Sequence, residues 1–189
     1  MKTKKRKITD AELSEILYRH WKFLIGKPGG ERANLSNVNL EGLGLRYMHL
    51  QGADLSFANL HDANLECALL QDADLHGADL SGANLGAATM WNTDLRGANL
   101  VNANLWCTEL TGANLRGANL SHSAWPLHCG SLDAVIDRQI FAQLLYHAVR
   151  AGLKSKDKDV LAVCRIPEVV AMANQFNRVN DKDEPRRIQ

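Results

Sequence analysis

The sequence predicts a solenoid, a stack of short coils, over about half of its 189 residues. Leucine occupies every fifth position from Leu35 to Leu120, with Met90 as the one exception, and alanine stands two places before thirteen of these eighteen positions. A five-residue period matches neither the repeat of an α-helix nor the two-residue repeat of a strand. Each unit is therefore one side of a coil, and coils must stack to bury their leucine and alanine side chains.

The segment before the repeats is predicted to be a basic disordered tail, residues 1–8, followed by a capping helix within residues 9–32. Thr9 and Glu12 have the spacing of a capping box, and apolar residues recur at helical spacing until Gly26. The predicted apolar face consists of Leu13, Ile16, Leu17, Trp21, Leu24 and Ile25. The first coil of a solenoid exposes an edge of unpaired backbone groups, so we expect this helix to cover that edge.

The segment after the repeats, residues 123–180, is predicted to be helical, and residues 181–189 are predicted to be a disordered tail. Trp125-Pro126 ends the repeat pattern, and apolar residues then follow at helical spacing from Leu132 to Val149. Phe141 and Leu145 widen the apolar arc of this helix. A helix that is apolar over a wide arc must pack against two surfaces. One would be the last coil and the other a second copy of the chain, so we predict a homodimer through this helix.

The repeats run from Ala33-Asn34-Leu35 to Ala118-Asn119-Leu120 and resemble those of the pentapeptide repeat family, whose pattern is A-(N/D)-L-x-x. The resemblance covers residues 33–122 and implies a mainly β architecture, a right-handed quadrilateral β-helix with four pentapeptides per coil. Eighteen pentapeptides then form about 4.5 coils, and a strand spacing of ~4.8 Å gives a stem about 22 Å tall. The C-terminal segment, from Trp125 to Val179, resembles that of pentapeptide repeat proteins from bacteria and their phages.

Charge is unevenly distributed along the chain. Residues 1–32 carry a net charge of +5, residues 33–122 carry −6 and residues 123–189 carry +2. Some pentapeptide repeat proteins are acidic rods that bind DNA gyrase in place of duplex DNA. The resemblance therefore raises an alternative function, a DNA-mimicking inhibitor of gyrase, of another topoisomerase or of a host defence nuclease. Against it, five acidic side chains precede a central leucine, where short polar side chains bond the turn backbone. These five are Asp54, Asp74, Asp79, Asp94 and Glu109.

Five residues on the outer surface are candidates for binding. Trp91 and Trp106 each follow a central residue, so they point outward on adjacent faces of neighbouring coils. There they are either open to a partner or covered by the C-terminal helices. His76, Arg96 and Arg116 are twenty residues apart and form a neutral-to-basic stripe, where a phosphate mimic would be negative. We predict a protein partner and no direct binding to nucleic acid.

Catalytic, cofactor and metal sites are not predicted. The chain has no nucleotide-binding loop and no G-x-S-x-G, H-E-x-x-H or C-x-x-C motif. A zinc-containing catalytic domain would be a third alternative, but its candidate ligands fit no known spacing. They are His122, His128, Cys129, His147 and Cys164. No apolar stretch approaches the ~20 residues of a membrane span and no signal peptide is recognisable, so we expect a cytoplasmic protein without a membrane partner. The sequence therefore predicts a non-enzymatic protein-binding module.

Overall fold

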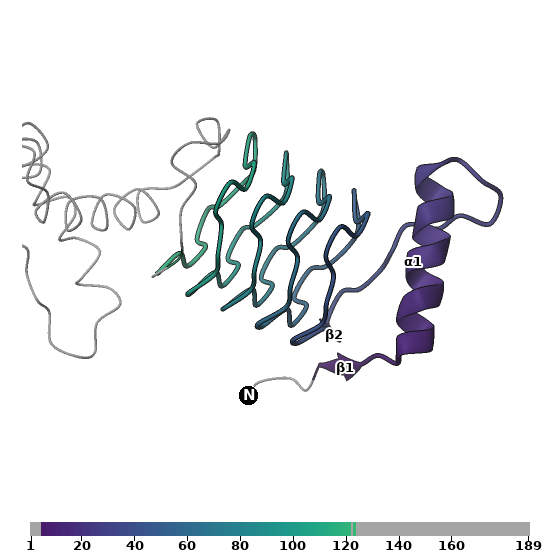
Figure 1. Cartoon of the computed structure of the whole chain (residues 1–189), viewed down its shortest axis with the longest axis horizontal. Coiled ribbons are helices and arrows are strands. Elements are labelled where there is room, and N and C mark those ends of the chain that lie inside the picture. Colours follow the sequence, from purple (N-terminus) through teal and green to yellow (C-terminus); the bar gives the residue numbers. More distant parts are fainter. Residues whose placement is uncertain (1–4, 122, 124–189) are drawn as a thin grey trace, which may run out of the picture. The chain divides into compact units, whose positions relative to one another are not determined.

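The computed structural model describes residues 5–121 and residue 123. In chain order they form β1 (Arg6–Lys7), α1 (Asp10–Leu24), β2 (Val38–Asn39) and a stack of coils (Figure 1). Apart from Ser123, the predicted C-terminal helical region and tail lie outside the described residues. The same holds for the predicted dimer helix and for all five candidate zinc ligands.

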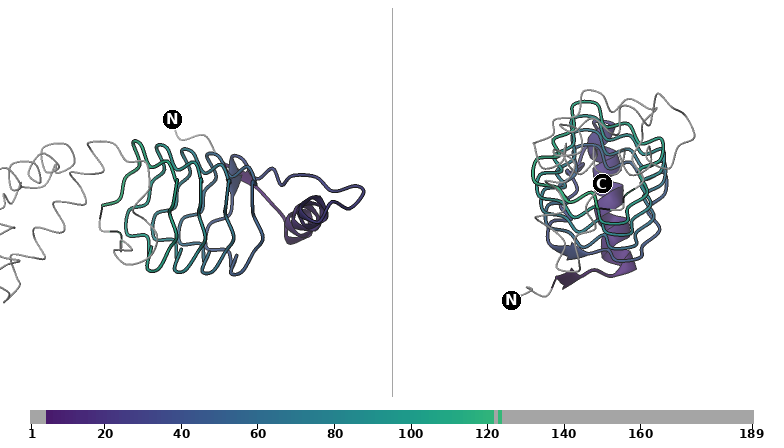
Figure 2. Two further views of the ribbon diagram at one scale, coloured as in Figure 1. Left: turned by 90° about the horizontal axis from the view of Figure 1, so that it is seen from above. Right: turned by 90° about the vertical axis from the view of Figure 1, so that its left-hand side faces the viewer.

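The repeats stack into a β-helix whose coils have four sides (Figure 2). Parallel β-bridges join residues twenty positions apart, which is one turn of the coil. We call the four sides faces A to D in chain order. The bridged residues are Asn34, Asp54, Asp74, Asp94 and Asn114 on face A; Asn39, Asn59, Asp79, Asn99 and Asn119 on face B; Gly44, Asn64, Asn84 and Asn104 on face C; and His49, Leu69, Thr89 and Glu109 on face D.

Backbone hydrogen bonds connect each coil to the coils on both sides of it. The amide of Leu55 donates to the carbonyl of Asp74 in the next coil (2.7 Å), and the amide of Asp54 donates to the carbonyl of Ala33 in the coil before (2.9 Å). The corner between faces A and B is closed by the amide of Ala58, which donates to the carbonyl of Leu55 (3.1 Å). The same pattern recurs along the stack, so neighbouring coils satisfy each other's backbone groups.

The interior of the β-helix is built from the two columns that the sequence predicted to point inward. The central leucines and Met90 are buried, as are the alanines two places before them. Thr93 and Thr108 replace alanine, and their buried hydroxyls donate to the carbonyls of Leu70 and Leu85 (2.8 Å each). The predicted inward register is confirmed, and these two threonines keep it because their hydroxyls have partners.

Helix α1 lies across the open end of the first coil (Figure 2). The predicted capping box is present, since the Thr9 hydroxyl accepts from the Glu12 amide and the Glu12 side chain accepts from the Thr9 amide. The predicted apolar face is only partly correct, because Trp21 and Ile25 are exposed. His20 is the fully buried residue, and its Nδ1 accepts from the Ala33 amide (3.1 Å). The helix therefore packs against the first coil with only one edge of its apolar face.

None of the helices in the described part of the chain is long and apolar enough to cross a membrane.

Residues 6 and 7 correct the prediction of a disordered tail over residues 1–8. They form β1, which pairs in parallel with β2, so that Arg6 lies opposite Val38 and Lys7 opposite Asn39. The Arg6 amide donates to the carbonyl of Asn37 (3.1 Å). A two-residue strand has no sequence pattern of its own, and it forms here because the first coil offers unpaired backbone groups on face B.

Acid is expected to destabilise the protein through His20. Burial, followed by the nearby charges of Arg32 and His49, lowers the pKa of His20 from its ordinary value of 6.5. The unfolded state therefore takes up the proton first. The free energy of unfolding should fall as the pH drops from about 6.5 toward the lowered pKa, and it should level off below that pKa. Denaturant midpoints measured from neutral pH to about pH 5 check this.

A His20→Gln variant is the control for this pH dependence. Glutamine keeps an acceptor for the Ala33 amide but cannot titrate, while every other ionisable group is the same in both proteins. The difference between the two pH profiles therefore isolates His20. Profiles of equal slope would contradict the assignment.

Candidate functional site

Most acidic and amide side chains of the repeats hold the backbone rather than face a partner. The carboxylate of Asp54 accepts from the Ser56 amide (3.0 Å), and that of Asp74 accepts from the His76 amide (3.0 Å). The same contact, two residues along the chain, is made by Asn34, Asn59, Asn64, Asp79, Asn84, Asp94, Asn99, Asn104, Asn114 and Asn119. The structural role predicted for the aspartates in this position is confirmed.

The stripe of His76, Arg96 and Arg116 lies on face A, next to the aspartate column, and is less basic than the sequence suggested. Nη2 of Arg96 is 2.5 Å from Oδ2 of Asp94, and its Nε donates to both carboxylate oxygens (2.9 Å each). These hydrogen bonds lower the pKa of Asp94, and burial only partly opposes them. Nδ1 of His76 is 3.6 Å from Asp74. Arg116 follows Asn114 rather than an aspartate and is exposed.

His76 also belongs to a contact that the sequence analysis missed. Its ring meets the Phe57 ring edge-on, with centroids 4.3 Å apart, and the Lys5 ammonium donates to the Phe57 carbonyl. A Cβ at Gly77 would come within 2.5 Å of the Phe57 ring, so glycine makes room for it. Residues twenty positions apart occupy equivalent places in successive coils. The bulky Phe57 stands twenty residues before a glycine, Gly77, and this pairing was the sequence signal for the contact.

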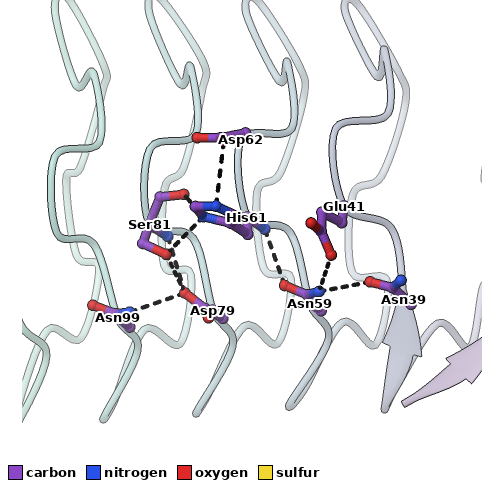
Figure 3. Close-up of polar contacts among 8 residues, drawn as sticks. All are labelled: Asn39, Glu41, Asn59, His61, Asp62, Asp79, Ser81 and Asn99. Carbon is purple, nitrogen blue, oxygen red and sulfur yellow. Dashed lines mark hydrogen bonds and ion pairs between the residues drawn. The ribbon is translucent and has the colours of Figure 1, made fainter. Parts of the chain in front are cut away.

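Face B displays a ladder of amide and carboxylate side chains (Figure 3). The Asn59 amide donates to Oδ1 of Asn39 (2.6 Å) and to Oε2 of Glu41 (3.1 Å). Two coils further on, the Asn99 amide donates to Oδ1 of Asp79 (2.9 Å). Side-chain ladders of this kind tie successive coils together.

A histidine bridges two coils on the same face. Nδ1 of His61 donates to the carbonyl of Ser81 (2.8 Å), and its Nε2 lies 3.3 Å from Oδ2 of Asp62 (Figure 3).

Face B also carries partly buried negative charge. Burial alone would raise the pKa of Asp79, but hydrogen bonds from the Ser81 hydroxyl and amide and from Asn99 outweigh it and lower the pKa. From Asn39 to Ser121, the outward positions of face B have three carboxylates and no lysine or arginine.

Trp91 and Trp106 are the exposed tryptophans of the stem. Trp91 is 47% exposed and Trp106 is 68% exposed. Trp91 follows the central residue of face D, and Trp106 follows the central residue of face C in the next coil, so the two lie on adjacent faces of neighbouring coils. Within residues 5–121 no ring contact joins them. The two indoles are therefore separate exposed rings and not one stacked pair.

A charged groove of about 500 Å³ lies between α1 and the segment that enters the first coil. It is lined by Arg6, Ala11, Glu12, Glu15, Ile16, Arg19, Glu31, Arg32 and Asn34. Exposed ion pairs join Arg6 to Glu12 (3.4 Å) and Arg19 to both Glu15 (2.7 Å) and Glu31 (3.3 Å). The described residues hold no group of three His, Cys, Asp or Glu side chains placed to bind a metal ion.

Comparison with known proteins identifies the repeats. The sequence profile of pentapeptide repeats matches eight copies, over residues 31–66, 49–86, 78–117 and 93–124. No curated protein sequence is a significant match. Among solved structures, the chain is similar to HetL, a pentapeptide repeat protein involved in heterocyst differentiation regulation in the cyanobacterium Nostoc sp. strain PCC 7120. That match has 32% identity and a TM-score of 0.36, and it covers 56% of this chain and 52% of HetL.

Two further structures are similar to this chain. One is a pentapeptide repeat protein of the Arabidopsis thaliana thylakoid lumen, with 30% identity, a TM-score of 0.40 and coverage of 57% of this chain and 72% of that one. The other is QnrB1, a plasmid-mediated fluoroquinolone resistance protein, with 19% identity, a TM-score of 0.42 and coverage of 60% and 65%. The chain thus spans about half the length of HetL and about two thirds of QnrB1. Its matched repeats, its bridge ladders and its buried leucine and alanine columns show that this chain belongs to the pentapeptide repeat family, whose fold is a right-handed quadrilateral β-helix.

Proposed function

We propose that this protein is a non-enzymatic binding module whose protein partner contacts the stem through Trp91 on face D and Trp106 on the adjacent face C. The exposure of these two indoles carries the proposal, since most other outward positions of the repeats hold small or polar residues. Tryptophan buries a large area at low entropy cost and is enriched among the residues that dominate binding energy. The partner would therefore use two anchors on adjacent faces of the stem.

The stem is suited to presenting such anchors because its backbone is fixed on both sides of them. The carbonyl of Trp91 accepts from the Asp72 amide (2.9 Å), and the carbonyl of Trp106 accepts from the Ala87 amide (2.8 Å). The Trp106 amide also donates to the Asn104 side chain (3.0 Å). A surface held in place before binding loses little conformational entropy when it binds. Arg96, Arg116 and His76 are secondary candidates, since Arg96 already pairs with Asp94.

A DNA-mimicking inhibitor remains the second candidate, favoured by the carboxylates of face B, which has no lysine or arginine among its outward positions. The charge density argues against it. Duplex DNA carries one charge per ~1.7 Å, so a stem about 22 Å tall would need about 13 charges. The repeats carry a net charge of −6, and Glu66 is paired with Arg46 (3.0 Å). We therefore rank binding through the indoles first.

A double variant, Trp91→Ala with Trp106→Ala, tests the proposed surface. The melting temperature should change little, while capture of the native partner from a lysate of the host, quantified by mass spectrometry, should fall by about tenfold or more. Tyr18→Ala with Trp21→Ala is the matched control, because it removes two other exposed rings, and it should capture the partner normally. A large loss of melting temperature would place the indoles in an intramolecular contact instead, and release of the partner by duplex DNA would favour mimicry.

Other features of the proposed function remain predictions from the sequence. They are the cytoplasmic location, the bacterial or phage origin, the homodimer through the C-terminal helix, and the absence of a cofactor.

A further inference from the structure

One flank of α1 is left uncovered by the first coil. Tyr18, Trp21 and Ile25 are 51%, 47% and 46% exposed. Their spacing of three and four residues places them on one side of the helix. The rings of Tyr18 and Trp21 stack with centroids 6.0 Å apart and planes 18° apart. We call these three residues the α1 flank. It lies beside the docked edge that contains His20 rather than within it.

Most of the charges near the α1 flank that are not paired are basic, because Glu15, one helical turn before Tyr18, is paired with Arg19. Between Ile16 and Gly30 the chain has three basic residues and no acidic residue. Arg19 is neutralised by Glu15 and Glu31. Lys22 lies with its Nζ 4.6 Å from the centroid of the Tyr18 ring, and no ion pair of Lys22 or Lys27 is found among the described residues. The flank therefore combines apolar rings with two uncompensated positive charges.

We propose that the α1 flank binds the surface of an anionic lipid bilayer, with the stem pointing away from it. Tryptophan and tyrosine favour the headgroup level of a bilayer, where their rings are buried and their polar edges stay hydrated. Lysines beside them meet anionic headgroups. The net charge of +5 in residues 1–32 is attracted to such a surface, whereas the net charge of −6 in residues 33–122 is repelled. Attraction of the N-terminal segment and repulsion of the repeats would orient the molecule with α1 on the bilayer and the stem pointing away from it.

A bilayer fits the flank better than a second copy of the chain does. Aromatic side chains expose at most about 150–250 Å² each, so three half-exposed residues offer roughly 300 Å². A specific protein interface buries about 800 Å² on each partner. A fluid lipid surface needs no matching partner surface, and it supplies the negative charge that a second basic flank lacks. The sequence predicted no membrane partner because it has no spanning segment, whereas this flank is defined only by how α1 packs on the first coil.

Flotation of the full chain with lipid vesicles tests the proposal. The protein should float with vesicles of phosphatidylcholine plus phosphatidylglycerol and not with phosphatidylcholine alone, and high salt should release it. Each basic residue near an anionic surface is worth roughly a fivefold gain in partition, so Lys22→Glu with Lys27→Glu should lower binding by more than about tenfold. Tyr18→Ala with Trp21→Ala should lower it similarly. Trp91→Ala with Trp106→Ala is the matched control on the stem and should bind like the unchanged protein.

Four outcomes would overturn the proposal. They are no flotation with anionic vesicles, equal flotation with neutral vesicles, an equal loss in the stem control, and a dimer in light scattering that the Tyr18 and Trp21 changes abolish while vesicle binding is absent. The last outcome would make the flank a contact between two copies. Because the stem control leaves the α1 flank intact, vesicle binding can fail or succeed independently of partner capture through Trp91 and Trp106.

Discussion

Replacing Leu75 by aspartate is expected to unfold the β-helix. Leu75 is completely buried in the middle of the stack, between Leu55 and Leu95 of the same column. The interior around it is built from leucine and alanine side chains, which offer a carboxylate no partner. Burying an unpaired charge costs several kcal/mol, a large part of the roughly 5–15 kcal/mol that stabilises a folded domain. Loss of the cooperative melting transition in circular dichroism would show the unfolding.

Val101→Asp is the matched control for this change. Val101 is also apolar, but it follows a central leucine and is only half-buried on face B, so an aspartate there stays in contact with water. We expect its free energy of unfolding to stay within about 1 kcal/mol of that of the unchanged protein. Similar losses at Leu75 and Val101 would contradict the division into inward and outward positions.

Replacing Gly30 by alanine is expected to push the last turn of α1 away from the segment that leads into the first coil. A Cβ at Gly30 would lie 2.3 Å from the Phe23 amide nitrogen and 2.6 Å from the Lys22 carbonyl carbon. Both atoms belong to the backbone of the last turn of α1, so no side-chain rotation can relieve the overlap. Overpacking of this kind costs on the order of 1–3 kcal/mol. A lower melting temperature, with faster hydrogen exchange in α1 and in the first coil, would be the measured result.

Gly44→Ala separates this close approach from a general effect of replacing glycine. No atom lies within 4 Å of a Cβ at Gly44, so we expect a change within about 0.5 kcal/mol. If both alanine variants melt at the same temperature as the unchanged protein, α1 does not pack against residue 30 as described.

The repeat sequence carried most of the information about the stem. Each leucine and each preceding alanine meets the same environment in every coil, so a local pattern repeated eighteen times is enough to define the inward columns. Outward placement of Trp91 and Trp106 followed from the same register. Contacts between coils, such as Phe57 with His76, were available only by comparing residues about twenty positions apart.

Which of the outward charges are paired could be seen only in the folded structure. Asp94 and Arg96 are two residues apart, but their ion pair forms because the turn backbone brings the guanidinium back over the carboxylate that accepts from the Arg96 amide. The spacing alone predicted a neutral-to-basic stripe of His76, Arg96 and Arg116. The exposed positions could therefore be located from the sequence, but which of their charges are paired could not.

The sequence by itself determined the β-helical register and the start of α1 at Thr9, because both depend on residues that are neighbours along the chain or repeat at a fixed period. Only the tertiary structure decided which edge of α1 is docked, since periodicity defines an apolar arc but not the part of it that the first coil can cover. It buried His20 and left Trp21 and Ile25 exposed. It also ordered Arg6–Lys7 as β1, because an open strand edge, rather than any pattern in those residues, supplies the hydrogen bonds.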